Sequence, residues 1–273
     1  MEEVLHGQCR PDVLHKLKAF ELVRFSHEHT VFPSHFLRRL SSLENLVVSD
    51  ALIEEIVLHE EKNDDNNLIE ILAQLRELKL SKLPKLKFLS KDDLKSSLVF
   101  QNLESLEVLE CGNLEILVPS SVSFQCLKRL EVSKCHGLVT VITSSTAKSL
   151  VQLTTMSINE CEMLEEIITV NDDEVDNEII FRKLKSLRLN RLSRLRKFYS
   201  GMSALTFPSL EELNVTECPK MEIISQADLK MPKLKKVEVT EGAALQQLLA
   251  KTVHTVYPTR KFCLLFDVQL KLG

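Results

Sequence analysis

The sequence predicts an α/β fold of the solenoid type, built as a stack of short units around a parallel sheet. The first observation is a spacing, clearest in Leu103-x-x-Leu106-x-Val108-x-x-Cys111-x-x-Leu114-x-x-Leu117. The second is its recurrence, since nine such frames start 24 to 32 residues apart. They begin at Leu17, Leu43, Leu75, Leu103, Leu127, Leu153, Leu184, Leu210 and Leu234, with weaker matches in the first three and the last. A unit this short buries its apolar side only against its neighbours, so the pattern predicts a leucine-rich-repeat solenoid, shaped as a horseshoe or arc.

Each frame is expected to supply one strand of the sheet. Leu106 and Val108 alternate with Ser105, Glu107 and Leu109, and this two-residue period is typical of a strand with one buried face. Parallel strands need a crossover, and the roughly 20 remaining residues of each unit provide it. We therefore expect nine strands in a parallel sheet on the concave face, about 40 Å long.

Short helices and irregular turns are expected on the convex face, because prolines interrupt most crossovers and disfavour long helices. The segment 92–97 and the stretch around 147–150 are the best helix candidates. A second apolar row lies three residues before the frames and is expected to stack behind the sheet. It consists of Phe100, Phe124, Leu150, Phe181 and Phe207.

The ends of the chain depart from the frame, as capping units do. We expect an N-terminal cap or partial repeat at 1–40, about eight repeats at 41–250, and a C-terminal cap or tail at 251–273. The apolar segment Phe262 to Phe266 is expected to cover the last open layer, an exposed tail being the alternative.

Composition narrows the class of function. The formal net charge of −4 argues against a general nucleic-acid or membrane binder. No apolar run approaches the roughly 18 residues of a membrane-spanning helix. The N-terminus lacks the basic and apolar regions of a secretory signal. A cytoplasmic protein is expected, with the nucleus, or the membrane periphery through partners, as further locations.

Four of the seven cysteines occupy one position, eight residues after the first leucine of the frame. They are Cys111, Cys135, Cys161 and Cys218. Elsewhere the same position holds Leu83, Leu192, Ala51 or Gly242. Exchange with small apolar residues predicts a structural ladder of buried, reduced thiols that pack as small hydrophobic groups.

No motif for catalysis, metal or cofactor binding stands out. A zinc site could be imagined from His6-x-x-Cys9 and His27-x-His29, but zinc needs four converging ligands and no second close cysteine pair supports the site. Cys135-His136 resembles a nucleophile beside a base, but Cys135 belongs to the buried ladder. The six glycines form no phosphate-binding loop. We therefore expect a protein that is not an enzyme and needs no cofactor.

The strand side chains that point away from the core form the most extended surface for binding a partner. The candidate partner-binding residues are Lys79, Glu107, Leu109, Arg129, Glu131, Arg188 and Arg191. An ordinary solvated sheet face is the alternative interpretation. Two acidic inserts, at 60–65 and 172–178, coincide with the longest repeats and are either solvated loops or electrostatic contacts with a partner domain.

The residues of the individual repeats also resemble those of a known protein family. Phe207-Pro208-Ser209-Leu210-Glu211-Glu212-Leu213-Asn214-Val215-Thr216-Glu217-Cys218-Pro219-Lys220-Met221 resembles the repeats of plant coiled-coil, nucleotide-binding, leucine-rich-repeat disease resistance proteins. The likeness covers roughly residues 40–250. It implies a module that senses a pathogen effector or a modified host protein and restrains a nucleotide-driven switch in a full receptor.

The resemblance also raises a second hypothesis. The coiled-coil and nucleotide-binding domains of that family have no counterpart in these 273 residues, so we expect a fragment, a truncated paralogue or a partial gene model. As a free-standing chain it would act as a structural adaptor or decoy that binds the nucleotide-binding or coiled-coil domains of receptors. The family's repeat region supplies no catalytic residue in either case.

Overall fold

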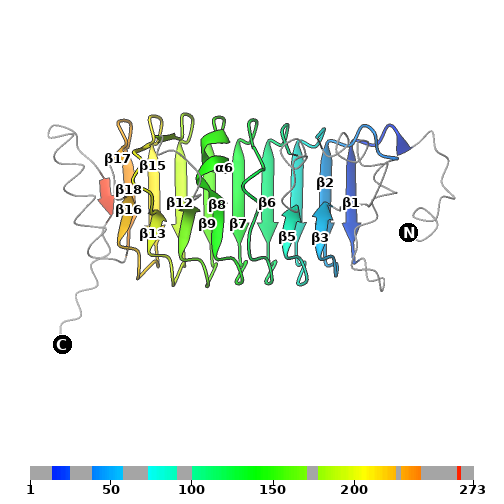
Figure 1. Cartoon of the computed structure of the whole chain (residues 1–273), viewed down its shortest axis with the longest axis horizontal. Helices are drawn as coiled ribbons and strands as arrows, with labels where there is room; N and C mark the ends of the chain where they lie inside the picture. The colour runs from blue at the N-terminus through cyan, green and yellow to red at the C-terminus, as the bar shows by residue number, and fades with distance from the viewer. Residues whose placement is uncertain are drawn as a thin grey trace.

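The computed structural model describes residues 14–24, 39–57, 73–90, 100–170, 178–225, 229–240 and 263–265. In these residues the chain is a row of parallel strands lying side by side along the molecule (Figure 1). One long sheet contains ten strands, in the spatial order β1 (Ala19–Val23), β2 (Asn45–Ser49), β4 (Glu77–Ser81), β6 (Ser105–Leu109), β7 (Arg129–Ser133), β9 (Thr155–Asn159), β12 (Ser186–Asn190), β15 (Glu212–Thr216), β18 (Lys236–Val239) and β19 (Cys263–Leu265).

The predicted frames and the long sheet agree strand by strand. Each of the first nine strands begins two residues after the first leucine of its frame, as β6 does after Leu103. Neighbouring repeats pair without a shift in register, so Leu106 lies beside Leu130 and Val108 beside Val132. All four of these side chains are buried. The leucine-rich-repeat solenoid with a parallel sheet is confirmed.

The crossovers differ from the expectation of short helices and irregular turns, because most of them contain short strands. One smaller parallel sheet is formed by β16 (Ile223–Ser225), β13 (Lys197–Tyr199), β10 (Glu166–Thr169) and β8 (Thr140–Thr143). A second contains β11 (Ile179–Ile180), β14 (Leu205–Thr206) and β17 (Leu229–Lys230), and a third contains β3 (Glu55–Val57) and β5 (Phe88–Ser90). Their β-branched and aromatic residues favour strands, and stacking at a constant offset lets each one pair with the next repeat.

One of the two helix candidates is confirmed. Helix α6 (Ser144–Ser149) begins after Thr143, whose hydroxyl accepts a hydrogen bond from the backbone N–H of Thr146. The Thr146 hydroxyl donates to the carbonyl of Val122 at 3.2 Å, and the Ser149 hydroxyl accepts from the N–H of Phe124 at 2.9 Å. These bonds fasten the helix to the preceding repeat. The other candidate, 92–97, lies outside the described residues.

The core lies between the long sheet and the smaller sheets, and the predicted apolar row stacks within it. The ring centroids of Phe100 and Phe124 lie 6.1 Å apart in a stacked arrangement, and those of Phe181 and Phe207 lie 5.2 Å apart. Phe198 contacts both members of the second pair edge to face. Fully burying such a side chain contributes about 1.5–3 kcal/mol, so the row is a major source of cohesion between repeats.

The cysteine ladder is buried as predicted. The side chains of Cys111, Cys135, Cys161 and Cys218 have no exposed surface, and none of the five cysteines whose side chains are described forms a disulfide. Each of these thiols donates to the carbonyl two residues before it, for example from Cys161 to Asn159 at 3.3 Å. Burial raises the pKa of Cys161 to about 12. The thiol is therefore protonated and unreactive at neutral pH.

At the C-terminal end, β19 pairs with β18 and adds a tenth strand, with Lys236 beside Cys263. The proposed zinc ligands and both acidic inserts lie largely outside the described residues, and the division into caps and repeats stays a prediction. Within the described part of the chain, no three side chains are grouped in a way that suits a metal ion. No helix found there is long and apolar enough to cross a membrane.

Candidate protein-interaction surface

The exposed side of the long sheet arranges its outward side chains in straight columns. The central column contains Glu21, Val47, Lys79, Glu107, Glu131, Ser157, Arg188, Asn214 and Glu238. Parallel strands lie about 4.8 Å apart, so neighbouring members of a column are close enough to form ion pairs and hydrogen bonds. Whatever binds this face therefore meets side chains that already contact one another.

Four of the seven candidate residues form two ion pairs. The Lys79 ammonium contacts a Glu107 carboxylate oxygen at 2.8 Å across β4 and β6. The Arg129 guanidinium contacts Glu131 at 2.6 Å along β7, and this hydrogen bond raises the pKa of Arg129. These pairs hold the side chains in place and partly neutralise the charge offered to a partner.

The other three candidates lie apart from these pairs. Arg188 lies on β12, beyond the uncharged strand β9, and contacts Glu212 at 3.6 Å. Leu109 is half-buried at the end of β6. Arg191 is not on the sheet face but directly after β12, where it contacts Glu160 at 3.9 Å and Glu217 at 3.0 Å. The structure therefore spreads six candidates along the face of the sheet and places Arg191 at the C-terminal end of a strand.

Two rows of residues flank the strands of the long sheet, one at the N-terminal ends of the strands (the leading edge) and one at their C-terminal ends (the trailing edge). The sequence-based candidates included one member of these rows, Arg191, but neither row as such. The leading row consists of the residue immediately before each of the first nine strands of the long sheet. Its members are Lys18, Glu44, Arg76, Glu104, Lys128, Thr154, Lys185, Glu211 and Lys235. Apart from Thr154, cations and carboxylates alternate from repeat to repeat.

Ion pairs connect the leading row. Glu44 contacts Lys18 at 2.8 Å and Arg76 at 3.9 Å. Glu104 contacts Arg76 at 3.2 Å and Lys128 at 2.5 Å. Hydrogen bonds from Lys18, Lys128 and Lys235 hold the carboxyl pKa values of Glu44, Glu104 and Glu211, respectively, below their usual range.

The trailing row consists of the residue immediately after each of the first eight strands of the long sheet, counted in the spatial order given above. Its members are Arg24, Asp50, Lys82, Glu110, Lys134, Glu160, Arg191 and Glu217, and their charges alternate without a break. All eight have φ between 51° and 55°. This left-handed conformation costs a non-glycine residue roughly 1–2 kcal/mol, so glycine would suit the backbone better. Keeping charged residues there indicates that the charges contribute to the stack or to binding.

Both rows could have been found in the sequence. The signal is the residue after the first leucine of each frame and the residue seven after it. Grouping charges by their neighbours along the chain hides this signal, because adjacent members of a row lie 24 to 32 residues apart.

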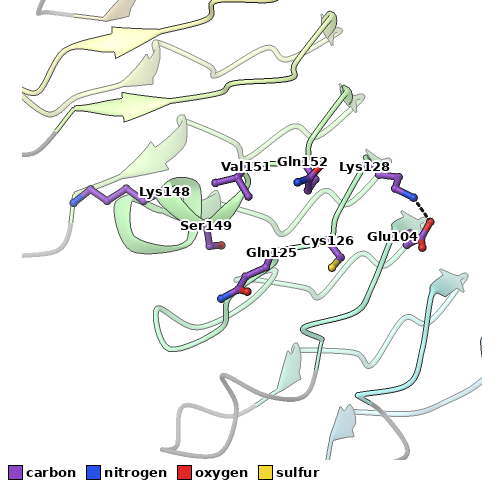
Figure 2. A pocket seen from close by; sticks show the side chains of 8 residues that line it. All are labelled: Glu104, Gln125, Cys126, Lys128, Lys148, Ser149, Val151 and Gln152. Atoms are coloured by element: carbon purple, nitrogen blue, oxygen red, sulfur yellow. Dashed lines mark hydrogen bonds and ion pairs between the residues drawn. The ribbon is translucent and has the colours of Figure 1, made fainter.

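One pocket of about 550 Å³ opens beside the leading row. Figure 2 shows Gln125 and Cys126 on one side, Ser149 and Val151 on the other, and Lys128 bonded to Glu104 at one end. Lys148, from α6, points away from Lys128. The lining mixes polar and apolar groups and contains no pair of side chains arranged for acid–base or nucleophilic chemistry.

The in-register sheet, the repeats that each supply one strand to it and the buried leucine and cysteine rows define the class of this protein as a leucine-rich-repeat solenoid. The fold is similar to that of a solved structure, the leucine-rich repeat domain of the type III effector XopL. The TM-score is 0.54 at 17% sequence identity, over 91% of this chain and 76% of that one.

The chain belongs to a particular family of such proteins. The family model described as plant disease resistance protein RPS2-like, leucine-rich repeats, matches residues 1–123 and 121–243. The chain is also 37% identical over 70 residues to the disease resistance protein SUMM2 of Arabidopsis thaliana. That match covers 25% of this chain and 8% of SUMM2. The resemblance seen in the repeats is confirmed, and membership supports a role in protein recognition during plant defence.

Proposed function

We propose that this chain recognises a pathogen effector or a modified host protein through the exposed face of its long sheet. The observation that carries this proposal is the family match over most of the chain. The nine-strand face of charged and polar side chains supports it, since an extended solenoid surface suits a protein ligand. Within a full receptor, the same repeats would also contact the coiled-coil or nucleotide-binding domain and restrain a nucleotide-driven switch.

Many side chains on this face are already held in place by hydrogen bonds, which favours tight recognition. Thr216 donates to the side-chain oxygen of Asn190 at 2.9 Å, and Asn214 donates to Glu238 at 2.8 Å. Lys79 and Glu107 are likewise already paired. Side chains fixed before binding lose less conformational entropy when a partner docks, which is the main cost of ordering an interface.

The test uses a receptor that carries these repeats, expressed transiently in leaves together with the effector that triggers it. Replacing Lys79, Arg129 and Arg188 with alanine on the face should abolish effector-dependent cell death and weaken binding of the ligand by about tenfold or more. The matched control replaces Lys85, Arg194 and Lys220, three exposed cations outside the long sheet, and should keep both.

If the face variant and the control respond alike at equal protein levels, the sheet face is not the recognition surface. The size of the endogenous polypeptide, measured with an antibody against the C-terminal tail, distinguishes a free-standing chain from repeats that belong to a full receptor. A band near 31.2 kDa would favour the free-standing adaptor or decoy, and a much larger band would favour the receptor.

A further inference from the structure

The alternating charges of the leading row are interrupted once. Repeats with a cation and repeats with a carboxylate alternate along the row, and the sixth position, Thr154, falls where a carboxylate is due. Its two neighbours in the row are the lysines Lys128 and Lys185. The same repeat keeps its carboxylate in the trailing row, as Glu160. The irregularity is therefore confined to the leading edge.

The intact positions show what a carboxylate does in this row. Glu104 lies between two cations and contacts both, Arg76 at 3.2 Å and Lys128 at 2.5 Å. Arg76 and Lys128 are two strands apart, or about 10 Å along the sheet. Lys128 and Lys185 are also two strands apart. A carboxylate between them would therefore meet the same geometry that Glu104 meets.

Thr154 does not replace the missing group. Its N–H and its hydroxyl both bond to the carbonyl of Lys128 at 2.8 Å, so its polar atoms serve the backbone. The outward residues of β9 are Thr155, Ser157 and Asn159, none of which is charged. The sixth repeat thus presents an uncharged strip between two basic neighbours.

More positive charge and open space adjoin this strip. The Lys183 ammonium lies against the side-chain oxygen of Gln152 at 2.5 Å. Gln152 also lines the pocket beside Lys128 (Figure 2). The pocket leaves room next to Lys128 for the chain of a bound peptide.

We propose that the gap at Thr154 receives an acidic side chain of a protein partner, whose carboxylate lies between Lys128 and Lys185 and completes the leading row. This inference rests on the proposed function, because it assumes a protein ligand, and it names the chemistry and place of one contact. A carboxylate fits better than a phosphate, because the row already holds carboxylates in this setting and the flanking cations are lysines, without the forked guanidinium that binds phosphate in two places.

The first experiment measures the binding of a fluorescein-labelled hexaglutamate peptide to the full chain by anisotropy at low ionic strength. The peptide should bind, and the affinity should fall as salt is raised, because the contacts are exposed ion pairs. Thr154→Glu should weaken binding by about tenfold, since it occupies the gap and repels the ligand. Ser49→Glu on β2 adds the same charge four strands away and should change the affinity less than about twofold.

A second pair of variants tests the cations. Lys185→Gln should weaken hexaglutamate binding several-fold, whereas Lys82→Gln, which removes an exposed lysine from the trailing row, should leave it nearly unchanged. Thr154→Glu should also raise the melting temperature by about 1 °C relative to Ser49→Glu, because the new carboxylate pairs with two lysines. This stability readout reports on the gap even without a ligand.

Several results would overturn the proposal. These are no binding of hexaglutamate to the wild type, equal losses in Thr154→Glu and Ser49→Glu, or a melting temperature lowered by Thr154→Glu. Binding of pyrophosphate but not of the peptide would make the ligand a phosphate. Tighter peptide binding after the acidic residues at 172–176 are neutralised would make the occupant the chain's own insert. None of these results affects the receptor test with Lys79, Arg129 and Arg188, so the two proposals fail separately.

Discussion

The two edges of the long sheet carry similar alternating charges on different backbones. At the trailing edge every charged residue has positive φ, and in one of the turns that follow, Gly137 packs against the backbone of Gly112 in the neighbouring repeat. At the leading edge each residue's N–H bonds to the carbonyl of the preceding member, and an open pocket lies beside Lys128. The backbone constrains sequence at the trailing edge, while side chains at the leading edge can change at low cost. Recognition residues are therefore expected at the leading edge and on the face, and the one break in alternation lies there.

The largest effect is expected from Gly137→Ala in a trailing-edge turn. A Cβ at this position would lie 2.5 Å from the carbonyl oxygen of Gly112 in the neighbouring repeat. Two backbones would have to separate, which should lower the free energy of unfolding by about 2 kcal/mol. Gly112→Ala is the matched control, since nothing lies within 4 Å of its Cβ. Urea unfolding followed by circular dichroism separates the two, and equal midpoints would show that the turns are not tightly stacked.

The next largest difference in unfolding free energy is expected between two cysteine-to-serine variants, one from each edge. Cys161→Ser places a hydroxyl in the buried ladder and should cost about 1–2 kcal/mol of unfolding free energy. Cys126→Ser changes a half-buried side chain in the leading-edge pocket and should cost less than about 0.5 kcal/mol. Mass spectrometry after brief iodoacetamide treatment should find Cys126 alkylated and Cys161 unmodified. Rapid alkylation of Cys161 would contradict its burial.

A glycine placed at each edge sharpens the comparison further. Glu110→Gly should change stability by less than about 0.5 kcal/mol, because relief of the left-handed backbone at φ 54° offsets the greater entropy of the unfolded chain. Glu104→Gly removes two ion pairs without such relief and should cost about 1 kcal/mol more. Thermal unfolding of the two variants in parallel tests this order, which the reverse ranking would refute.

The smallest effect is a dependence on pH at the leading edge. Folding lowers the pKa values of its carboxyl groups. The contribution of these carboxylates to the free energy of unfolding is therefore complete above the unfolded pKa near 4.5 and is lost as the pH falls through the folded pKa. The wild type should melt about 1 °C above Glu104→Gln at pH 7 in low salt, and this difference should disappear once the Glu104 carboxylate is protonated in the folded state, below its unfolded pKa. A difference that grows in acid would have the wrong sign for these ion pairs.

The periodic parts of the structure could be predicted from sequence. A strand two residues after each frame leucine, a buried thiol ladder and the stacked phenylalanines all follow from spacing, because identical offsets in a stack bring the same positions together. Short strands such as Ile167-Ile168 in β10 could not, since two apolar residues in a turn suit several conformations. They become strands only because the next repeat offers a partner. The charge rows were available in principle, but they appear only when residues are compared between repeats.

Alternating charge also gives the molecule a period of two repeats, which restricts how the gene can change length. Losing the third repeat alone would bring Glu44 beside Glu104 and Asp50 beside Glu110, so like charges would meet at both edges. Losing two consecutive repeats from the first four would keep opposite charges adjacent at both edges. Recombination that adds or removes repeats in pairs should therefore give folded paralogues more often than recombination that moves a single repeat. The number of repeats in such an array would then change in steps of two.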